Sequence, residues 1–197
     1  QAAFDGYSIL VLSDRGISNQ HAAIPSLLAV GGVHHHMIRN GTRLKVSLVV
    51  ESGEPREVHH FACLFGYGAS AINPYLACET VENIIDNSPS GEGLQLEPEK
   101  AVSKYINAAT KGVLKTMSKM GISTLQSYHG AQIFEALGLS QKFVDEFFTW
   151  TPTRIEGIGL KEVADDSTAN HGLAYRTAEI PAELDLDIGG LYLWRAT

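Results

Sequence analysis

The sequence predicts an α/β fold with a mostly parallel sheet, and three observations support this prediction. Short β-rich runs alternate with stretches of helical spacing between residues 8 and 86. The strand-like runs end in polar loops and the helical stretches end near glycine or asparagine, as in repeated βαβ units. With 197 residues, of which 44% are hydrophobic and 19% charged, the chain suits one domain with its own core.

The first half of the chain predicts three strand-helix pairs. In the first helical stretch, apolar residues keep helical spacing from Pro25 to a C-cap at Asn40 and Gly41. The six expected segments are a buried strand "YSILVLSD", a helix "IPSLLAVGGVHHHMIRNG", a strand "RLKVSLVVES", a helix "VHHFACLFGYG", a strand "ASAINPYL" and a helix "ACETVENIID".

The second half opens with a connection rich in Ser, Gly and Pro, residues 87 to 98. A broad apolar face then predicts a long helix from Glu99 to Gly121. The remaining segments are a strand and loop "ISTLQSYHG", a short helix "AQIFEALGL", a helix "SQKFVDEFF" with Ser140 as N-cap, an extended "TPTRIEGIGL", and a helix followed by a polar connection. We expect an α/β domain over 1–160 and a segment leading to a neighbouring domain over 161–197.

Composition narrows the class of protein. The formal charge is −7, and no Lys/Arg cluster stands out as a stripe, so we expect no nucleic-acid partner. No apolar run reaches membrane-spanning length and no signal peptide opens the chain, so an intracellular compartment is expected. Cys63 and Cys78 lie in apolar stretches without metal spacing and are interpreted as reduced core residues. The start at Gln1 and the final "LYLWRAT" suggest a piece of a longer polypeptide.

Histidines are the most conspicuous candidates for a metal site. His34, His35 and His36 are adjacent, and neighbouring helical residues point about 100° apart, so at most two can share a metal. We therefore expect one of them to face the core. His59 and His60 are also adjacent, so they too lack the spacing of metal ligands on a helix. The nearby carboxylates Glu51, Glu54 and Glu57 can instead interact with the positive ends of helix dipoles.

Other candidate sites are equally generic. "GYGAS", "YHGA" and "GIGL" are possible phosphate loops, but none matches a dinucleotide fingerprint or a P-loop. No Gly-x-Ser-x-Gly elbow is present, and neither cysteine has a setting that favours a thiolate. Polar residues predicted at strand ends would line the active face of an α/β fold. They are Asp14, Arg15, Glu51, Ser52, Asn73, Gln126 and Tyr128.

Four long motifs in unbroken order carry a resemblance that covers about Tyr7 to Leu160. They are "IPSLLAVGGVHHHMIRNG", "VVESGEPREVHHFACLFGYGASAINPYLA", "MSKMGISTLQSYHGAQIFEALGL" and "TRIEGIGL". The chain closely resembles the central domain of the glutamate synthase large chain, with weaker likeness in "LDIGGLYLWR". His129 and Trp150 depart from that family's pattern, in which a longer basic residue and a glycine are common at those two positions.

The resemblance implies a rudimentary, partial (β/α) barrel that links an amidotransferase domain to an FMN-binding domain. In such enzymes, ammonia from glutamine is added to 2-oxoglutarate and reduced to glutamate with FMN, an iron–sulfur cluster, and NADPH or ferredoxin as electron donor. The family's catalytic and cofactor residues have no matching positions here, so no catalytic, cofactor-binding or metal residue is predicted on this chain. The resemblance implies a bacterial cytoplasm or plastid stroma as the compartment.

Two other functions stay open at this point. The chain could be a stand-alone module that binds a small anionic ligand or an FMN-like phosphate at the strand C-termini, near Glu51 to His60 and Gln126 to Gly130. It could also be a histidine-rich metal enzyme that holds zinc. As an isolated connector it is further expected to self-associate or to expose an apolar patch at strand edges or around "FFTWTPTRIEGIGL".

Overall fold

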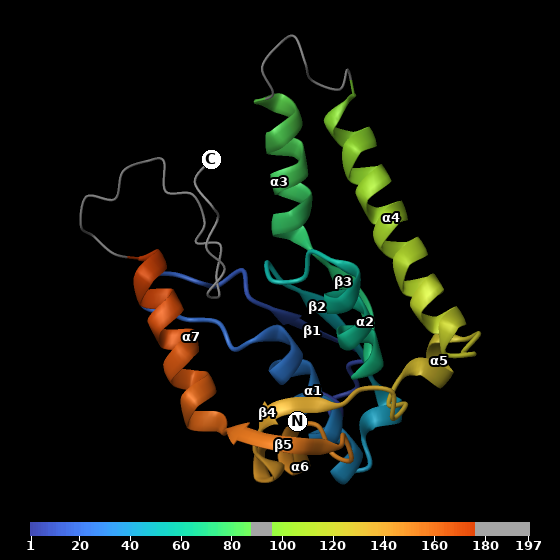
Figure 1. Ribbon diagram of the computed structural model, residues 1–197, viewed down its shortest axis with the longest axis vertical. Coiled ribbons are helices and arrows are strands. Elements are labelled where there is room, and N and C mark those ends of the chain that lie inside the picture. The colour runs from blue at the N-terminus through green and yellow to red at the C-terminus, as the bar shows by residue number, and fades with distance from the viewer. Residues whose placement is uncertain (88–95, 176–197) are drawn as a thin grey trace, which may run out of the picture.

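The computed structural model describes residues 1–87 and 96–175, which form an α/β body with a projecting helical hairpin (Figure 1). No helix within these two ranges is long and apolar enough to cross a membrane. Most of the connection expected at residues 87 to 98, and the final segment 176–197 with "LDIGGLYLWR" and "LYLWRAT", lie outside the described ranges.

A three-stranded parallel sheet organises the first half of the chain. Its strands β1 (Ile9–Ser13), β2 (Ser47–Glu51) and β3 (Ala69–Asn73) lie in the order β1-β2-β3. Helices α1 (Ser26–Arg39) and α2 (Val58–Gly66) connect them, with a short 3-10 turn η1 (Arg43–Lys45) before β2. Both helices pack on one face of the sheet through a buried cluster of Val30, Val50, Leu64 and Ala69. The three predicted strand-helix pairs are thereby confirmed.

The other face of this sheet is open. Side chains alternate along a strand, so Val11, Val49 and Ala71, which share one register row, point away from α1 and α2. Val11 is 57% exposed and Ile9 is 58% exposed. The prediction that the first strand is buried is therefore wrong: β1 is an edge strand that is covered on one face alone.

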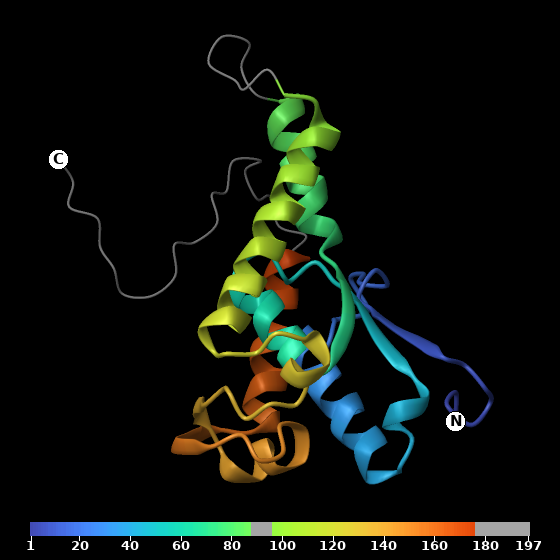
Figure 2. The same cartoon turned by 90° about the vertical axis from the view of Figure 1, so that its right-hand side faces the viewer.

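A helical hairpin follows β3. Helix α3 (Tyr75–Asp86) leads away from the sheet and α4 (Pro98–Lys119) returns antiparallel to it, as Figures 1 and 2 show. Pro98 occupies the first turn of α4, where a missing N–H costs nothing. The C-terminal half of α4 packs against α2 through Phe61, Val113 and Met117, which share a cluster with Tyr128.

The two segments that follow α4 correct the sequence analysis. "ISTLQSYHG" holds no strand but a single helical turn, α5 (Leu125–Tyr128), which begins where the Thr124 side chain accepts from the Ser127 N–H. "AQIFEALGL" ends in a strand, β4 (Ala136–Leu139), in place of the predicted helix. Each run is short enough that tertiary pairing overrides its local pattern.

A second, two-stranded parallel sheet closes the described chain. β4 pairs with β5 (Thr153–Ile158), and the helices α6 (Gln141–Phe147) and α7 (Leu160–Ala174) accompany it. The predicted Ser140 N-cap of α6 is confirmed, because its Oγ accepts from the Phe143 N–H. Phe143, Val144 and Phe148 pack against α1, which joins this unit to the first sheet. The five described strands form two separate parallel sheets and do not close a barrel.

Candidate functional site

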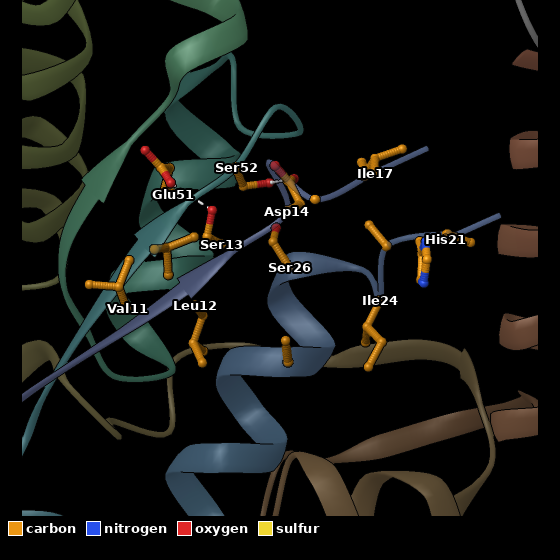
Figure 3. Close-up of a pocket in the computed structure, with 15 residues that line it drawn as sticks. Val11, Leu12, Ser13, Asp14, Ile17, His21, Ile24, Ser26, Glu51 and Ser52 are labelled. Atoms are coloured by element: carbon orange, nitrogen blue, oxygen red, sulfur yellow. Dashed lines mark hydrogen bonds between the residues drawn. The ribbon is translucent and has the colours of Figure 1, made fainter. Parts of the chain in front are cut away.

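Polar side chains gather at the carboxyl ends of β1 and β2 (Figure 3), and Asn73 ends the neighbouring strand β3, at the edge where ligands of α/β folds usually bind. Ser13, Glu51 and Asn73 occupy equivalent register positions of the three strands. A cavity of about 500 Å³ lies beside them, between the end of β1 and the start of α1. The sequence analysis placed five residues here correctly: Asp14, Arg15, Glu51, Ser52 and Asn73.

Glu51 is held by neighbours on both adjacent strands. Its carboxylate accepts from Ser13 Oγ at 2.6 Å, from Arg15 Nε at 3.0 Å and from Asn73 Nδ2 at 3.4 Å. The bond from Ser13 and then that from Arg15 lower the pKa of Glu51, and the same carboxylate raises the pKa of Arg15. Arg15 also stacks 4.0 Å from the centre of the Tyr75 ring.

Asp14 is the centre of a second set of bonds. Ser52 Oγ donates to its carboxylate at 2.6 Å, the Gly53 N–H donates at 3.0 Å and Tyr75 OH donates at 2.8 Å. Burial, and then the bond to Asp14, raise the pKa of Tyr75 to about 12, so the phenol keeps its proton at neutral pH. Both carboxylates at this end of the sheet therefore have protein donors on their oxygens.

Glu54 occupies the position at which a helix N-terminus would receive an anion. Its Oε2 accepts from the Ser26 N–H at 2.7 Å and from Ser26 Oγ at 2.6 Å, at the first residue of α1. A carboxylate at this place accepts from a backbone N–H that has no partner within the helix, and it interacts favourably with the positive end of the helix dipole. A phosphate at α1 would have to displace Glu54.

Gln126 and Tyr128 do not lie at this site, which corrects the sequence analysis. Tyr128 is fully buried in the cluster beneath α4, and Gln126 is exposed. The nearby Gly130 N–H donates to the Gly66 carbonyl at 2.7 Å, at the end of α2 and close to the start of β3. The two segments proposed for one anion site, 51–60 and 126–130, therefore meet opposite ends of the sheet.

The glycine-rich loops serve close packing. A Cβ on Gly68, whose φ is +111°, would lie 2.2 Å from His34 Nδ1, and a Cβ on Gly66 would lie 2.3 Å from Phe134. In "GIGL", a Cβ on Gly157 would lie 2.4 Å from the Gly138 carbonyl oxygen. These glycines let chain segments approach one another, a use the sequence pattern alone does not separate from phosphate binding.

Of the three adjacent histidines, His34 is buried, His35 is half-buried and His36 is exposed, so the expected core-facing histidine is confirmed. Arg43, which the sequence analysis did not single out, donates from Nε to His34 Nδ1 at 2.9 Å. The other two nitrogens of Arg43 donate to the Val46 and Gly68 carbonyls at 2.7 and 2.8 Å. Burial and then the Arg43 charge lower the pKa of His34 to about 4, so its imidazole is neutral and accepts.

The second histidine pair and the cysteines have ordinary surroundings. His60 contacts Glu57 at 3.1 Å, while His59 Nε2 lies 3.7 Å from Cys63 Sγ, one helical turn away. Burial raises the pKa of Cys63 to about 11 and also raises that of Cys78. Both thiols are free, as expected. Both are only partly buried, so the prediction that they are core residues is correct only in part. Residues 1–87 and 96–175 hold no group of three His, Cys, Asp or Glu side chains that could bind a metal.

These features define an α/β domain in which the two carboxylates beside the cavity, at the usual ligand-binding edge, accept hydrogen bonds from the protein itself. The family model "Glutamate synthase central domain" matches residues 1–140. The chain is 48% identical over 195 residues to the glutamate synthase [NADPH] large chain of Bacillus subtilis, covering 99% of this chain and 12% of that one. It is 42% identical over 192 residues to the glutamate synthase [NADH] of Schizosaccharomyces pombe, covering 97% and 9%.

A third relative is the ferredoxin-dependent glutamate synthase 2 of Synechocystis, 44% identical over 183 residues, covering 86% of this chain and 12% of that one. Among solved structures, a flavocytochrome b2 variant with sulfite bound aligns with a TM-score of 0.46 and 17% identity, over 65% of this chain and 29% of that chain. The chain belongs to the glutamate synthase central domain family, and it spans about a tenth of the length of these curated relatives.

Two observations on the described residues bear on the cofactors that the resemblance implies. An iron–sulfur cluster needs more thiolates than Cys63 and Cys78 supply, and both thiols have raised pKa values. For the FMN phosphate, the N-terminus of α1 already binds the Glu54 carboxylate, and the Gly130 N–H already donates to Gly66.

Proposed function

We propose that this chain is the structural connector of a glutamate synthase, linking its amidotransferase and FMN-binding domains, and that it contributes no catalytic residue. The single observation that supports this proposal is that protein groups already donate hydrogen bonds to both carboxylates at the carboxyl edge of the sheet. Asp14 and Glu51, the two carboxylates best placed for chemistry, each accept three protein hydrogen bonds. A general base or ligand-binding group would keep an oxygen free for substrate.

The parent activity is part of the same proposal. The relatives are named as NADPH, NADH and ferredoxin-dependent glutamate synthases, and the chain spans 9–12% of their length. We infer that the intact polypeptide makes glutamate from glutamine-derived ammonia and 2-oxoglutarate in a bacterial cytoplasm or plastid stroma. The division at residue 160, before a segment that leads to the FMN-binding domain, also belongs to this proposal.

The test replaces the two carboxylates in the intact polypeptide that contains this segment. For Asp14→Asn and Glu51→Gln we expect kcat for glutamate formation to change less than about twofold. Asp14→Asn should lose about 1–2 kcal/mol of unfolding free energy, because its hydrogen bonds from Ser52 and Tyr75 are part-buried, whereas Glu51→Gln should lose less, because the bonds of Glu51 are exposed. Glu99→Gln, an exposed carboxylate outside the network, is the matched control. A hundredfold loss of kcat without loss of stability would assign chemistry to this edge and refute the proposal.

A further inference from the structure

Helix α4 carries a basic stripe, which corrects the expectation that the lysines form none. Lys100, Lys104, Lys111, Lys115 and Lys119 are all exposed. At 100° per residue their spacings place them within about 100° of the helix circumference. Five lysines against Glu99 give α4 a formal charge of +4 in a chain whose total is −7. None of the five lies within ion-pair distance of a carboxylate in the described residues.

The neighbouring helix carries the opposite charge. Helix α3 has Glu79, Glu82 and Asp86 and no basic residue between Tyr75 and Asp86. The spacings of three and four residues place these carboxylates on one face, and all three residues are exposed. Among the residues that the structure describes, only Glu79 of these three forms an ion pair, with Arg15 at 3.6 Å. The hairpin therefore presents an acidic stripe and a basic stripe on adjacent helices.

We propose that the α3–α4 hairpin docks on the same hairpin of a second copy of this chain, with the acidic stripe of each against the basic stripe of the other. A two-fold axis brings the same pair of surfaces together twice, so one self-complementary hairpin suffices for both contacts. The chain itself carries both the carboxylates and the lysines that this contact needs, and each α3–α4 contact occurs twice in the dimer.

The position of the charges along the hairpin sets the direction of docking. Helix α3 ends at the tip of the hairpin and α4 begins there (Figure 2), so Glu82 and Asp86, in the last turns of α3, lie towards the tip and Lys111 and Lys115, in the second half of α4, lie towards the body. Lys111 is 13 residues after Pro98, which is about 20 Å along the axis. Two hairpins that run antiparallel place each tip beside the body end of the other, so the tip carboxylates face Lys111 and Lys115. Leu114, which is 57% exposed, lies one turn from Lys111 and adds apolar surface to this contact.

A second copy is favoured over a polyanion. Without α4, the chain has a formal charge of −11, so an extended nucleic acid or anionic membrane along the stripe would also meet a repulsive body. A second hairpin offers carboxylates to the lysines and lysines to the carboxylates, whereas a polyanion offers a partner to the lysines alone. The contact differs from the strand edges and the "FFTWTPTRIEGIGL" patch expected from the sequence, and it does not depend on the proposed function.

The test is a charge exchange in the intact polypeptide, followed by sedimentation velocity at about 50 mM and about 500 mM salt. We expect a dimer at low salt that dissociates at high salt. Lys111→Glu/Lys115→Glu and Glu82→Lys/Asp86→Lys should each raise the dissociation constant at least about tenfold, because attraction becomes repulsion at both symmetric contacts. An equimolar mixture of the two variants should restore a mixed dimer.

Lys45→Glu/Lys142→Glu makes the same charge change away from the hairpin and is the matched control. If circular dichroism shows that a reversal variant is misfolded, the neutral pair Lys111→Gln/Lys115→Gln replaces it. The proposal is overturned by a monomer at both salt concentrations, by a mixture that does not associate, or by hairpin variants that behave like the control. It is also overturned if the lysine variants lose retention on heparin while the dimer is unchanged.

Discussion

Acid should destabilise this domain through His34, which is buried and accepts a hydrogen bond from Arg43. A protonated imidazole would have two cationic groups 2.9 Å apart and would lose its acceptor nitrogen. Its pKa is lowered from 6.5 to about 4, so between these two values the unfolded chain binds a proton that the folded chain does not. The contribution of neutral His34 to the unfolding free energy is therefore fully present above pH 6.5, and it is lost as the pH falls towards 4.

The magnitude follows from proton linkage. One such histidine costs about 2 kcal/mol of unfolding free energy between pH 7.5 and pH 5, since the slope approaches about 1.4 kcal/mol per pH unit. The groups packed around it act in the same direction: the pKa values of His35 and His129 are also lowered, mainly by burial. Arg43 stays cationic throughout this range and adds repulsion.

Urea unfolding at a series of pH values measures this loss. In His34→Gln the side-chain oxygen can still accept from Arg43 but cannot take a proton, so we expect a lower stability at pH 7.5 and a distinctly shallower slope. His36→Gln, on the exposed side of the same helix, is the matched control. If the wild-type protein and His34→Gln lose stability in parallel down to pH 5, the reasoning about His34 is wrong.

Two further predictions concern single residues. Trp150 has a φ of +70° and is 79% exposed. Trp150→Gly should therefore raise the unfolding free energy by about 0.5–1 kcal/mol, because relief of the left-handed backbone strain exceeds the entropy cost of glycine. Trp150→Ala keeps the strain and should show no gain, and equal stability of the two variants in thermal unfolding would contradict this. Cys63 has a pKa of about 11, so its alkylation by iodoacetamide should still accelerate about tenfold per pH unit at pH 9; a plateau below pH 9 would contradict the raised value.

Helical spacing and capping residues predicted much of the fold correctly, because these signals are local. The helix beginning near Pro25, the long helix ending before Gly121 and the Ser140 cap all match the structure within a few residues. The segment from 122 to 139 was misassigned, since the strand Ala136–Leu139 exists through its pairing with Thr153–Ile158. A four-residue run has no periodicity that could reveal such a distant partner.

The candidate site was predicted in part for a related reason. Residues that directly follow a strand, such as Asp14 and Ser52, reach the carboxyl edge by topology alone. The pattern of "ISTLQSYHG" predicts a strand that would end near Tyr128, but the segment forms a helical turn and Tyr128 lies in the core. The sequence pattern does not single out Arg43, because its role depends on hydrogen bonds to His34 and to the Gly68 carbonyl, which are distant from it in sequence.

The order of the strands also bears on how the chain is made. All pairing within the first sheet joins strands that are neighbours in sequence, and it is complete at Asn73. Synthesis proceeds from the amino end, so this sheet and its two helices can assemble while the second unit is still being translated. The β4–β5 unit then docks on a finished surface of α1 through Phe143, Val144 and Phe148. Translation itself therefore supplies an order of assembly in which the earlier unit is the template for the later one.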